Sequence, residues 1–353
     1  MREIGSEYWL EQKVPEPAVP EAHRSVEGPL LPSKDKDRCY VLSGRTAIDL
    51  IIQDILKTRE IQKVCLPAWC CDSMIAPFVA HGIRVDFYDI RFDDALEGHT
   101  DGTDYTDIFY VTNYFGYENT MSIETVMRFK EQGCIIIYDR THSLFMDNDP
   151  YISLADYSFA SIRKWMGVIG GAVVAGVGEC ELNLCPYLDC KEKAMRMKKA
   201  FIEGDETIDK QAFLNLYSEF GHHLVEDYQN YEMDDLSYAL YKSTDLTAMR
   251  RKRRENARYL HEHLKDVKFI GELTDNAVPL FVPVFFESKE QRDAVRRKLI
   301  DAQIYCPIHW PKPALIPADF EANKIYDTEL SLICDQRYDL ADMERMVTLI
   351  NNL

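Results

Sequence analysis

Apolar residues recur with the period of a helix face along residues 48–56. They stand at positions i, i+3, i+4, i+7 and i+8 and are Ile48, Ile51, Ile52, Ile55 and Leu56. This spacing puts them on one stripe of an α-helix, so we predict an amphipathic helix that begins just after Ser43-Gly44. The short apolar run 39–42 before it predicts a strand, which makes Ser43-Gly44 a strand-to-helix junction.

Short apolar runs alternate with helical stretches through the first half of the chain. The predicted strands lie at residues 64–66, 84–88, 108–112, 134–138, 157–161 and 172–177, and the predicted helices at 75–79 and 123–129. Alternation of apolar strands with helices is typical of a mostly parallel sheet that is covered by helices on both faces. The sequence therefore predicts an α/β fold.

The pattern becomes helical and charged after about residue 188. A long helix is predicted over 247–265, then a strand at 279–286, a helix at 288–300, a strand at 304–308 and a closing helix around 340–350. We therefore predict a large domain over 34–246 and a small C-terminal α/β domain over 247–353. Five prolines between residues 15 and 32 predict that residues 1–33 form an extended arm.

The charge balance excludes some classes of partner. The 353 residues include 41 Lys and Arg against 59 Asp and Glu, a formal net charge of −18. This excess repels polyanions at long range, so we expect no binding of nucleic acid or of an anionic membrane. The chain shows no signal-peptide core and no membrane-spanning run. Several of its ten cysteines lie in apolar runs, where reduced, buried thiols are expected, so we predict a cytoplasmic protein.

Three short segments carry candidate chemistry. The first is Ser43-Gly44-Arg45-Thr46, because the N–H groups of a helix N-terminus can hold a phosphate and Gly44 permits a close approach. The alternative is an ordinary serine cap. The second is Asp139, which comes directly after a predicted buried strand. It therefore lies at the carboxyl edge of the sheet, where α/β folds bind ligands, and could pair with a protonated ring nitrogen. His142 lies three residues on. The alternative is an aspartate that caps the next turn.

The third segment contains Lys164, the only lysine between Lys130 and Lys191. It stands between apolar segments, and a desolvated lysine there could form a Schiff base, although a lysine that reaches the surface is the alternative. These three segments occur in the order that a pyridoxal 5'-phosphate (PLP) enzyme requires. The order is a phosphate cradle, then an acidic residue after a strand, then a lysine beyond another strand. The glycines at 167–171 lead into a strand, so they are not a dinucleotide-binding fingerprint.

The chain resembles the DegT/StrS-type family of PLP-dependent sugar aminotransferases, which have the fold type I architecture. The matching pieces are Gly5-Ser6-Glu7, Ser43-Gly44-Arg45-Thr46-Ala47, Leu66-Pro67-Ala68-Trp69, Asn113-Tyr114-Phe115-Gly116, Asp139-Arg140-Thr141-His142, Ser161-Ile162-Arg163-Lys164 and His309-Trp310-Pro311. Each piece is short, but their order and spacing together are specific to this family.

The resemblance implies a role for each matching residue. Lys164 holds the cofactor aldehyde and moves the proton in catalysis, Asp139 keeps the pyridine nitrogen protonated, and His142 contacts the phenolic oxygen. The phosphate is bound by Gly44, Arg45, Thr46 and Ser161, with Ser158 as the alternative to Ser161. The position of the usual stacking aromatic ring is Cys71, so either Trp69 supplies the stacking face or that face is small. His309, Asn113 and Arg337 are the substrate candidates, and Arg163 faces either an anion or solvent.

The resemblance also implies the reaction and the partners. An amino donor, expected to be glutamate, supplies an amino group to a keto-sugar, expected to be nucleotide-linked, in sugar biosynthesis of the kind that feeds cell-surface polysaccharide. Relatives are homodimers with shared active sites. One alternative is a PLP-dependent lyase, dehydratase or desulfurase, and a desulfurase would need Cys70 or Cys71 as an exposed thiolate. A non-catalytic relative is the other alternative.

Two further patterns are interpreted as structural. Cys180, Cys185 and Cys190 are five residues apart, unlike the closer pairs of zinc sites, so no metal is expected. The basic run 250–254 opens a long helix in an acidic chain, and we interpret it as a solvated or inter-subunit helix face.

Overall fold

The computed structural model describes residues 3–10, 38–103, 105–118 and 121–352. The chain separates into two compact units. Unit 1 comprises Met1–Ser6, Ile61–Asp156 and Asp245–Leu353, and unit 2 comprises Glu7–Glu60 and Tyr157–Thr244. Residues 11–33 of the predicted arm lie outside the described residues.

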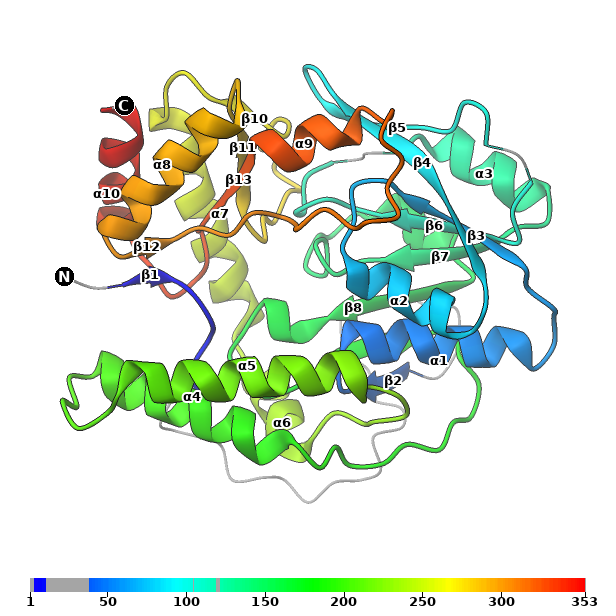
Figure 1. Cartoon of the computed structure of the whole chain (residues 1–353), viewed down its shortest axis with the longest axis horizontal. Helices are drawn as coiled ribbons and strands as arrows, with labels where there is room; N and C mark the ends of the chain where they lie inside the picture. Colours follow the sequence, from blue (N-terminus) through cyan, green and yellow to red (C-terminus); the bar gives the residue numbers. More distant parts are fainter. Residues whose placement is uncertain (1–2, 11–37, 104, 119–120, 353) are drawn as a thin grey trace. The chain divides into compact units, whose positions relative to one another are not determined.

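The first part of unit 1 is built on a mostly parallel sheet. Its strands lie in the spatial order β7-β6-β3-β4-β5 and span Lys63–Pro67 (β3), Arg84–Phe92 (β4), Leu96–His99 (β5), Ile108–Thr112 (β6) and Ile135–Asp139 (β7). β3, β4, β6 and β7 run parallel, and β5 pairs antiparallel with β4. Helices α2 (Asp72–Ala80) and α3 (Ile123–Glu131) flank this sheet, and a short helical turn, η1 (Pro150–Ser153), follows it (Figure 1). The predicted α/β sheet with flanking helices is confirmed.

The second part of unit 1 has its own core. An antiparallel sheet contains β10 (Lys268–Phe269), β11 (Val282–Phe285) and β13 (Glu329–Leu332), while β1 (Ile4–Gly5) pairs with β12 (Ile304–Tyr305). The helices are α7 (Leu246–His263), α8 (Lys289–Asp301), α9 (Ala322–Thr328) and α10 (Leu340–Asn351). Apolar side chains from α7, β11, α8, β13 and α10 form one buried cluster that includes Leu260, Val284, Leu299, Leu332 and Met346. This cluster buries the apolar helix faces that the periodicity predicts.

Unit 2 combines a small antiparallel sheet with helices. The strands lie in the order β2 (Arg38–Val41), β9 (Ala172–Ala175) and β8 (Tyr157–Ser161). The helices are α1 (Gly44–Leu56), α4 (Leu188–Ile202), α5 (Lys210–Glu226) and α6 (Asp235–Ser243), with a 3-10 turn, η2 (Ile162–Lys164), after β8. α4 and α5 lie side by side (Figure 1), and their facing side chains form a buried cluster around Met195, Phe213 and Phe220.

Most predicted elements are found within a few residues of their predicted bounds, and the differences have local causes. β8 and β9 are antiparallel because residues 162–171 between them hold a tight turn, whereas a parallel connection needs about a dozen or more residues. β12 ends at Tyr305, short of the predicted Ile308, and Pro307 has no N–H for a strand ladder. β5, β10, β13 and α9 are additional to the predicted elements.

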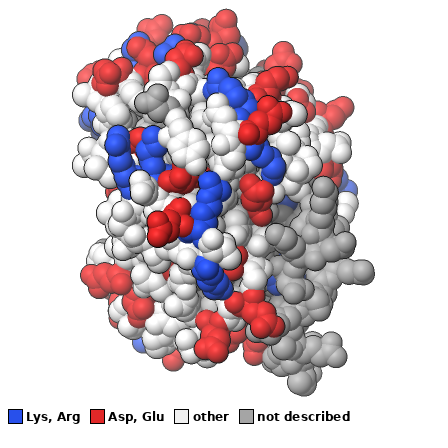
Figure 2. All heavy atoms as spheres, turned by 90° about the vertical axis from the view of Figure 1, so that its right-hand side faces the viewer, with Lys and Arg blue, Asp and Glu red and all other residues white. Residues whose placement is uncertain are grey.

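Acidic and basic side chains are interspersed over the face of the molecule in Figure 2. Pairs such as Lys130 with Asp156, 2.9 Å apart, illustrate how opposite charges lie together at the surface. All ten cysteines are free thiols, as predicted. Among the described helices, none is both long enough and apolar enough to cross a membrane.

Candidate active site

The helix N-terminus at Ser43 combines a cap with a close backbone approach. The Ser43 hydroxyl accepts the Thr46 N–H at 3.2 Å and lies 2.9 Å from the Thr46 hydroxyl, so the serine-cap interpretation is confirmed. A Cβ atom added to Gly44 would lie 3.6 Å from the Cβ of Ser161. The first turn of α1 therefore passes close to the end of β8, where its remaining N–H groups and the Ser161 hydroxyl are the kind of donors that a phosphate needs.

Arg45 uses its side chain elsewhere in unit 2. Its guanidinium donates to the Leu224 carbonyl at 2.9 Å and lies 5.4 Å from the centre of the Tyr228 ring. These contacts hold the charged group near the end of α5 and beside an aromatic face. The backbone of Arg45 belongs to the first turn of α1, so its contribution to the predicted cradle is its amide.

Lys164 ends a tight turn that the backbone fixes. The N–H groups of Ile162 and Arg163 both donate to the Gly171 carbonyl, at 2.9 and 3.2 Å. Lys164 is half-buried at the end of η2, three residues after the buried Ser161. The fixed backbone limits where the ammonium group can reach, which suits a lysine that must meet one particular atom.

Asp139 ends β7 and its carboxylate is held from two sides. The Tyr110 hydroxyl donates to Oδ2 at 2.9 Å, and the Thr141 N–H donates to Oδ1 at 2.8 Å. The Thr141 bond is the turn-capping contact that the alternative interpretation predicts, so that interpretation is confirmed, and pairing of Asp139 with a ring nitrogen stays a prediction. Burial, and after it the charge of Asp139, raises the pKa of Tyr110 well above its usual value, so the phenol stays a donor. Asp139 is thus a buried acceptor at the carboxyl end of a central strand.

An aromatic cluster surrounds His142 in unit 1. Its ring lies 4.6 Å from Phe115, stacks on Trp310 at 5.6 Å, and meets His309 edge-to-face at 6.1 Å. Trp69 belongs to the same cluster, 5.7 Å from Trp310. Unit 1 therefore brings Trp69, His142 and His309 together, with Asp139 three residues before His142 in the chain. Unit 2 places Gly44, Thr46, Ser158, Ser161 and Lys164 on α1, β8 and η2.

The two candidates for stacking on a cofactor ring differ in their surroundings. Trp69 is fully buried, stacks on Tyr114 at 4.7 Å, and donates its ring N–H to the His309 carbonyl at 2.5 Å. Cys71 is half-buried at the start of α2, with Sγ 2.9 Å from the Ser73 hydroxyl. The choice between them stays a prediction.

Two predicted substrate residues make structural contacts. The Asn113 amide donates to the Tyr117 carbonyl at 2.8 Å, and its oxygen accepts the Gly116 N–H at 3.1 Å, so this side chain closes the turn after β6. Arg337 forms two hydrogen bonds with Asp335, at 2.9 and 2.8 Å. Despite full burial, which acts in the opposite direction, Arg337 lowers the pKa of Asp335. A substrate contact by either residue would add to these bonds.

Three residues of this region were not singled out by sequence patterns: Tyr110, Glu329 and Ser331. The His309 backbone N–H donates to Glu329 at 2.7 Å, and His309 Nδ1 lies 2.8 Å from the Ser331 hydroxyl. The available signal was the alternation of Glu329 and Ser331 with Leu330 and Leu332, which has the period of a strand.

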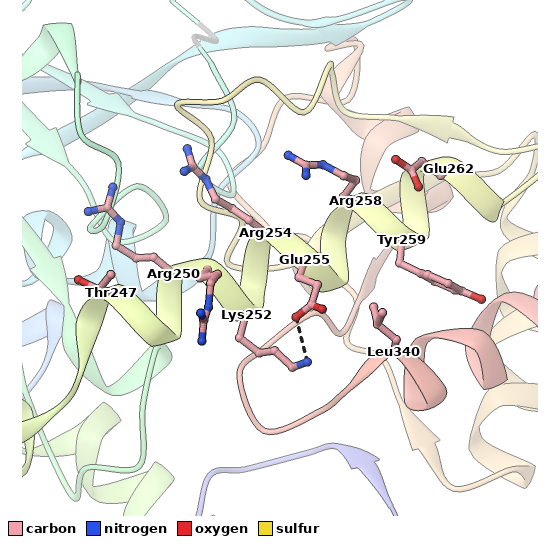
Figure 3. Close-up of a pocket in the computed structure, with 10 residues that line it drawn as sticks. Thr247, Arg250, Lys252, Arg254, Glu255, Arg258, Tyr259, Glu262 and Leu340 are labelled. Atoms are coloured by element: carbon pink, nitrogen blue, oxygen red, sulfur yellow. Dashed lines mark hydrogen bonds and ion pairs between the residues drawn. The ribbon is translucent and has the colours of Figure 1, made fainter.

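The basic run forms the first half of α7. Arg250, Arg251, Lys252 and Arg254 line a cavity of about 1020 Å³. Figure 3 shows the Arg250, Lys252 and Arg254 side chains among those that line it. Arg250 pairs with Asp147, Lys252 pairs with Glu255 at 3.0 Å, and Arg254 donates to the Ala277 carbonyl at 2.8 Å. Arg253, in the middle of the run, is instead fully buried and donates to the Pro279 and Leu280 carbonyls, so the prediction of a solvated face is wrong for this residue. The inter-subunit alternative stays a prediction.

The fold is similar to that of aminotransferases of known structure. The sugar aminotransferase CalS13 from Micromonospora echinospora matches with a TM-score of 0.62 and 13% identity, over 89% of this chain and 87% of the other. The PLP form of Spr1654 from Streptococcus pneumoniae matches with a TM-score of 0.63 and 13% identity, over 90% and 87%. A DegT DnrJ EryC1 StrS aminotransferase from Brucella abortus matches with a TM-score of 0.60 and 16% identity, over 89% and 85%.

No protein-family model and no curated protein matches the chain. At these identities the structural similarity concerns the fold. The chain has the fold of DegT/StrS-type aminotransferases, which confirms at the level of the fold the resemblance that the sequence motifs indicate.

Proposed function

We propose that this chain is a PLP-dependent aminotransferase of the DegT/StrS type. The observation that carries the proposal is Asp139, a buried carboxylate at the end of β7 that accepts hydrogen bonds from Tyr110 and Thr141. Such a carboxylate favours a protonated nitrogen heterocycle beside it. The fold shared with Spr1654, solved in a PLP form, supports the same cofactor.

The residues present fit this cofactor. Gly44, Arg45 and Thr46 at the start of α1 would bind the phosphate, Gly44 and Arg45 through their amides and Thr46 through its hydroxyl, with the Ser161 hydroxyl, or that of Ser158, as a further donor. Asp139 would bind the ring nitrogen, His142 the phenolic oxygen, and Trp69 or Cys71 one face of the ring.

When bound, PLP supplies an electron sink for the carbon next to a substrate amine. The chain's own groups do the rest. Lys164 would hold the cofactor aldehyde and would move the proton during amino transfer. Asp139 would hold a proton on the ring nitrogen. The burial of Asp139 keeps water away from its carboxylate.

The finer assignments rest on the family resemblance. We infer that the amino donor is glutamate and the acceptor a nucleotide-linked keto-sugar, and that His309, with Asn113 and Arg337, contacts substrate. Fold similarity to the sugar aminotransferase CalS13 supports a sugar acceptor. The division at residue 247 into a large and a small domain and the homodimer with shared sites belong to the same proposal.

Reduction with borohydride tests the cofactor and the lysine together. The purified protein should be yellow, and borohydride should attach the cofactor to the peptide that contains Lys164, as read by mass spectrometry. Lys164→Ala should lose this attachment and all turnover, while Lys242→Ala, at an exposed lysine, should keep both. A colourless protein that ignores added PLP would contradict the proposal.

The desulfurase alternative needs an exposed thiolate at Cys70 or Cys71, and the structure argues against Cys70. Cys70 is fully buried, and burial raises its pKa well above the usual value, so it is a poor thiolate nucleophile. Mixing the holoenzyme with L-glutamate separates the remaining options. Formation of 2-oxoglutarate with a change to the pyridoxamine spectrum indicates transamination, whereas the absence of a half-reaction with any amino donor favours a lyase.

A further inference from the structure

Three hydrogen bonds connect the buried carboxyl of Glu329 with His309, two of them leading through Ser331 to the His309 ring and one to its backbone. The Ser331 hydroxyl lies 2.5 Å from Glu329 Oε1, and His309 Nδ1 lies 2.8 Å from the same hydroxyl. The His309 backbone N–H donates to Glu329 Oε2 at 2.7 Å. Glu329 and Ser331 are two residues apart on β13, so their side chains leave the strand on the same face. The chain of contacts runs from a carboxyl, through a hydroxyl, to an imidazole.

His309 is also fixed by its surroundings. Its carbonyl accepts the ring N–H of Trp69 at 2.5 Å, and its ring lies 4.9 Å from Phe281 and 5.2 Å from Phe115. With its backbone held on both sides and its ring packed between aromatic groups, the imidazole has little rotational freedom. The proton on its ring is therefore the property that remains adjustable.

The Glu329 carboxyl lies in an environment that favours its neutral form. Burial raises its pKa to about 8, although the hydrogen bonds from Ser331 and His309 and the charge of Arg292 act in the opposite direction. Arg292 of α8 donates a hydrogen bond to the backbone carbonyl of Glu329, and not to its carboxyl, at 3.0 Å. The other titratable group facing the carboxyl is the Cys306 thiol, whose pKa burial raises to about 12 and which is therefore uncharged. His142 faces the His309 ring from the other side.

We propose that Glu329 and Ser331 form a proton relay that sets which nitrogen of His309 carries the ring proton. With Glu329 neutral, its O–H donates to the Ser331 oxygen, the Ser331 O–H donates to Nδ1, and the His309 proton stands on Nε2. With Glu329 ionised, the bonds reverse: Ser331 donates to the carboxylate, Nδ1–H donates to Ser331, and Nε2 becomes an acceptor. Passing from the first state to the second releases one proton at Nε2 and leaves one negative charge on Glu329.

The relay gives His309 a defined role toward its substrate. This step rests on the proposed function, in which His309 contacts the acceptor sugar. At neutral pH the Nε2–H group donates a hydrogen bond to an oxygen of that substrate, such as a hydroxyl or a carbonyl. Above the pKa of Glu329 the donor is lost. Glu329 and Ser331 are therefore positioning residues that act through His309.

Nitrogen NMR of full-length holoenzyme with 15N-labelled histidine reads the relay directly. Long-range 1H–15N correlations distinguish Nδ1–H from Nε2–H tautomers, and His309→Asn identifies the His309 signals among the nine histidines. We expect Nε2–H at pH 6.5 and a change to Nδ1–H with a midpoint near pH 8. A His309 tautomer that stays constant from pH 6 to pH 10 would overturn the relay.

Two variants test the direction of the hydrogen bonds. Glu329→Gln replaces the carboxyl with an amide that donates to Ser331 at every pH, so His309 should stay Nε2–H throughout. Ser331→Ala cuts the chain of contacts, so the His309 tautomer should no longer follow the transition near pH 8. Glu287→Gln, at an exposed glutamate, should keep the wild-type transition. A transition that persists in Glu329→Gln assigns it to another group and refutes the relay.

Kinetics connect the relay to catalysis. The wild-type KM for the acceptor should rise about tenfold as pH passes 8, the effect of about one lost hydrogen bond. Glu329→Gln should abolish that rise, while the half-reaction with the amino donor should be unchanged in both proteins. An acceptor KM with the same pH profile in both would refute the catalytic role. If the protein proves not to be an aminotransferase, the NMR transition still decides whether the relay exists.

Discussion

At the scale of single residues, the hydrogen bond from Tyr110 to Asp139 is a direct target. Tyr110→Phe removes one hydrogen-bond donor to the buried Asp139 carboxylate and leaves the ring in place. Because a hydrogen bond to a charged group contributes about 1.5–3 kcal/mol, we expect the affinity for PLP to fall by about tenfold or more. Titration of the apoprotein with PLP, followed by absorbance, measures this.

The matched control for that change is Tyr105→Phe. Tyr105 is exposed and its hydroxyl lies 3.3 Å from Asp107, so it offers the same chemical change away from Asp139. Equal affinities of the two variants for PLP would show that the Tyr110 hydroxyl does not support the proposed cofactor contact.

The buried carboxyl of Glu329 predicts a pH dependence of stability. Its pKa is raised to about 8 in the folded protein, against about 4.3 in an unfolded chain. Between these values the folded state retains a proton that the unfolded state releases, so the free energy of unfolding falls as pH rises through this window, by up to about 1.4 kcal/mol per pH unit. In Glu329→Gln, urea denaturation at pH 5 and pH 8 should show a smaller fall than in wild type. An equal fall would place the pKa of Glu329 near its usual value.

The sequence patterns pointed to the proposed site residues that would carry reactive groups and not to the residues that contact them. Asp139 and Lys164 stand out because a charged group next to an apolar run is unusual. Glu329 is also a charged residue next to an apolar residue, Leu330. Its role becomes visible only through its hydrogen bond with His309, which lies twenty residues earlier in the chain. Tyr110 lies inside an apolar strand and resembles a core residue until its hydroxyl is seen beside Asp139.

At the scale of elements, the turn after β6 depends on Gly116. Its φ is +78°, and an added Cβ would lie 2.2 Å from the Val278 carbonyl oxygen and 2.9 Å from that of His142. Both neighbours are backbone atoms that cannot rotate away. Gly116→Ala should therefore lower the free energy of unfolding by more than about 1 kcal/mol, measured by urea denaturation.

Gly133→Ala is a control that separates the conformational cost of a positive φ from the steric cost of the close approach at Gly116. Gly133 also has a positive φ, +85°, but an added Cβ there would meet nothing within 4 Å. It should show the conformational cost alone and be the less destabilised variant. If both variants lose the same stability, the close approach at Gly116 is not a constraint.

Helix α10 begins with a reciprocal pair of caps. Asp339 accepts the N–H groups of Ala341 and Asp342, and the Asp342 side chain accepts the Asp339 N–H. Asp339→Ala should cost about 1 kcal/mol of stability. The exposed mid-helix substitution Glu344→Ala is the control, and a thermal midpoint equal to that of the control would show that the cap contributes nothing.

Element positions were predictable where the period is long and regular, as in α1 and α7. They were less predictable where pairing depends on distant chain. β13 has four residues, and its strand conformation depends on pairing with β11, which lies more than forty residues earlier in the chain. β5 likewise depends on antiparallel pairing with β4. Short strands of this kind are selected by their partners, and single-sequence periodicity contains little information about them.

At the scale of the whole molecule, the net charge of −18 does not describe the surroundings of each charged group. Lys191 and Lys198, both buried on α4, contact Glu7 in unit 2, with Lys191 Nζ 3.0 Å from the Glu7 carboxylate. Burial lowers the pKa of Lys191, although Glu7 acts in the opposite direction. The average charge thus limits long-range partners, while individual cations determine local binding.

The proposed homodimer with shared sites makes a prediction about dilution. If residues of both subunits hold each cofactor, PLP binds the dimer more tightly than the monomer, so cofactor binding and dimerisation strengthen one another. Sedimentation should show a species of twice the chain mass in the holoenzyme, and its dissociation constant should rise at least about tenfold when PLP is removed. In turn, the apparent affinity for PLP should fall as the protein is diluted below that constant.

Lys242→Ala, which leaves the proposed cofactor contacts intact, should behave as wild type. A monomer that binds PLP with the same affinity at every protein concentration would show that each chain forms its site alone.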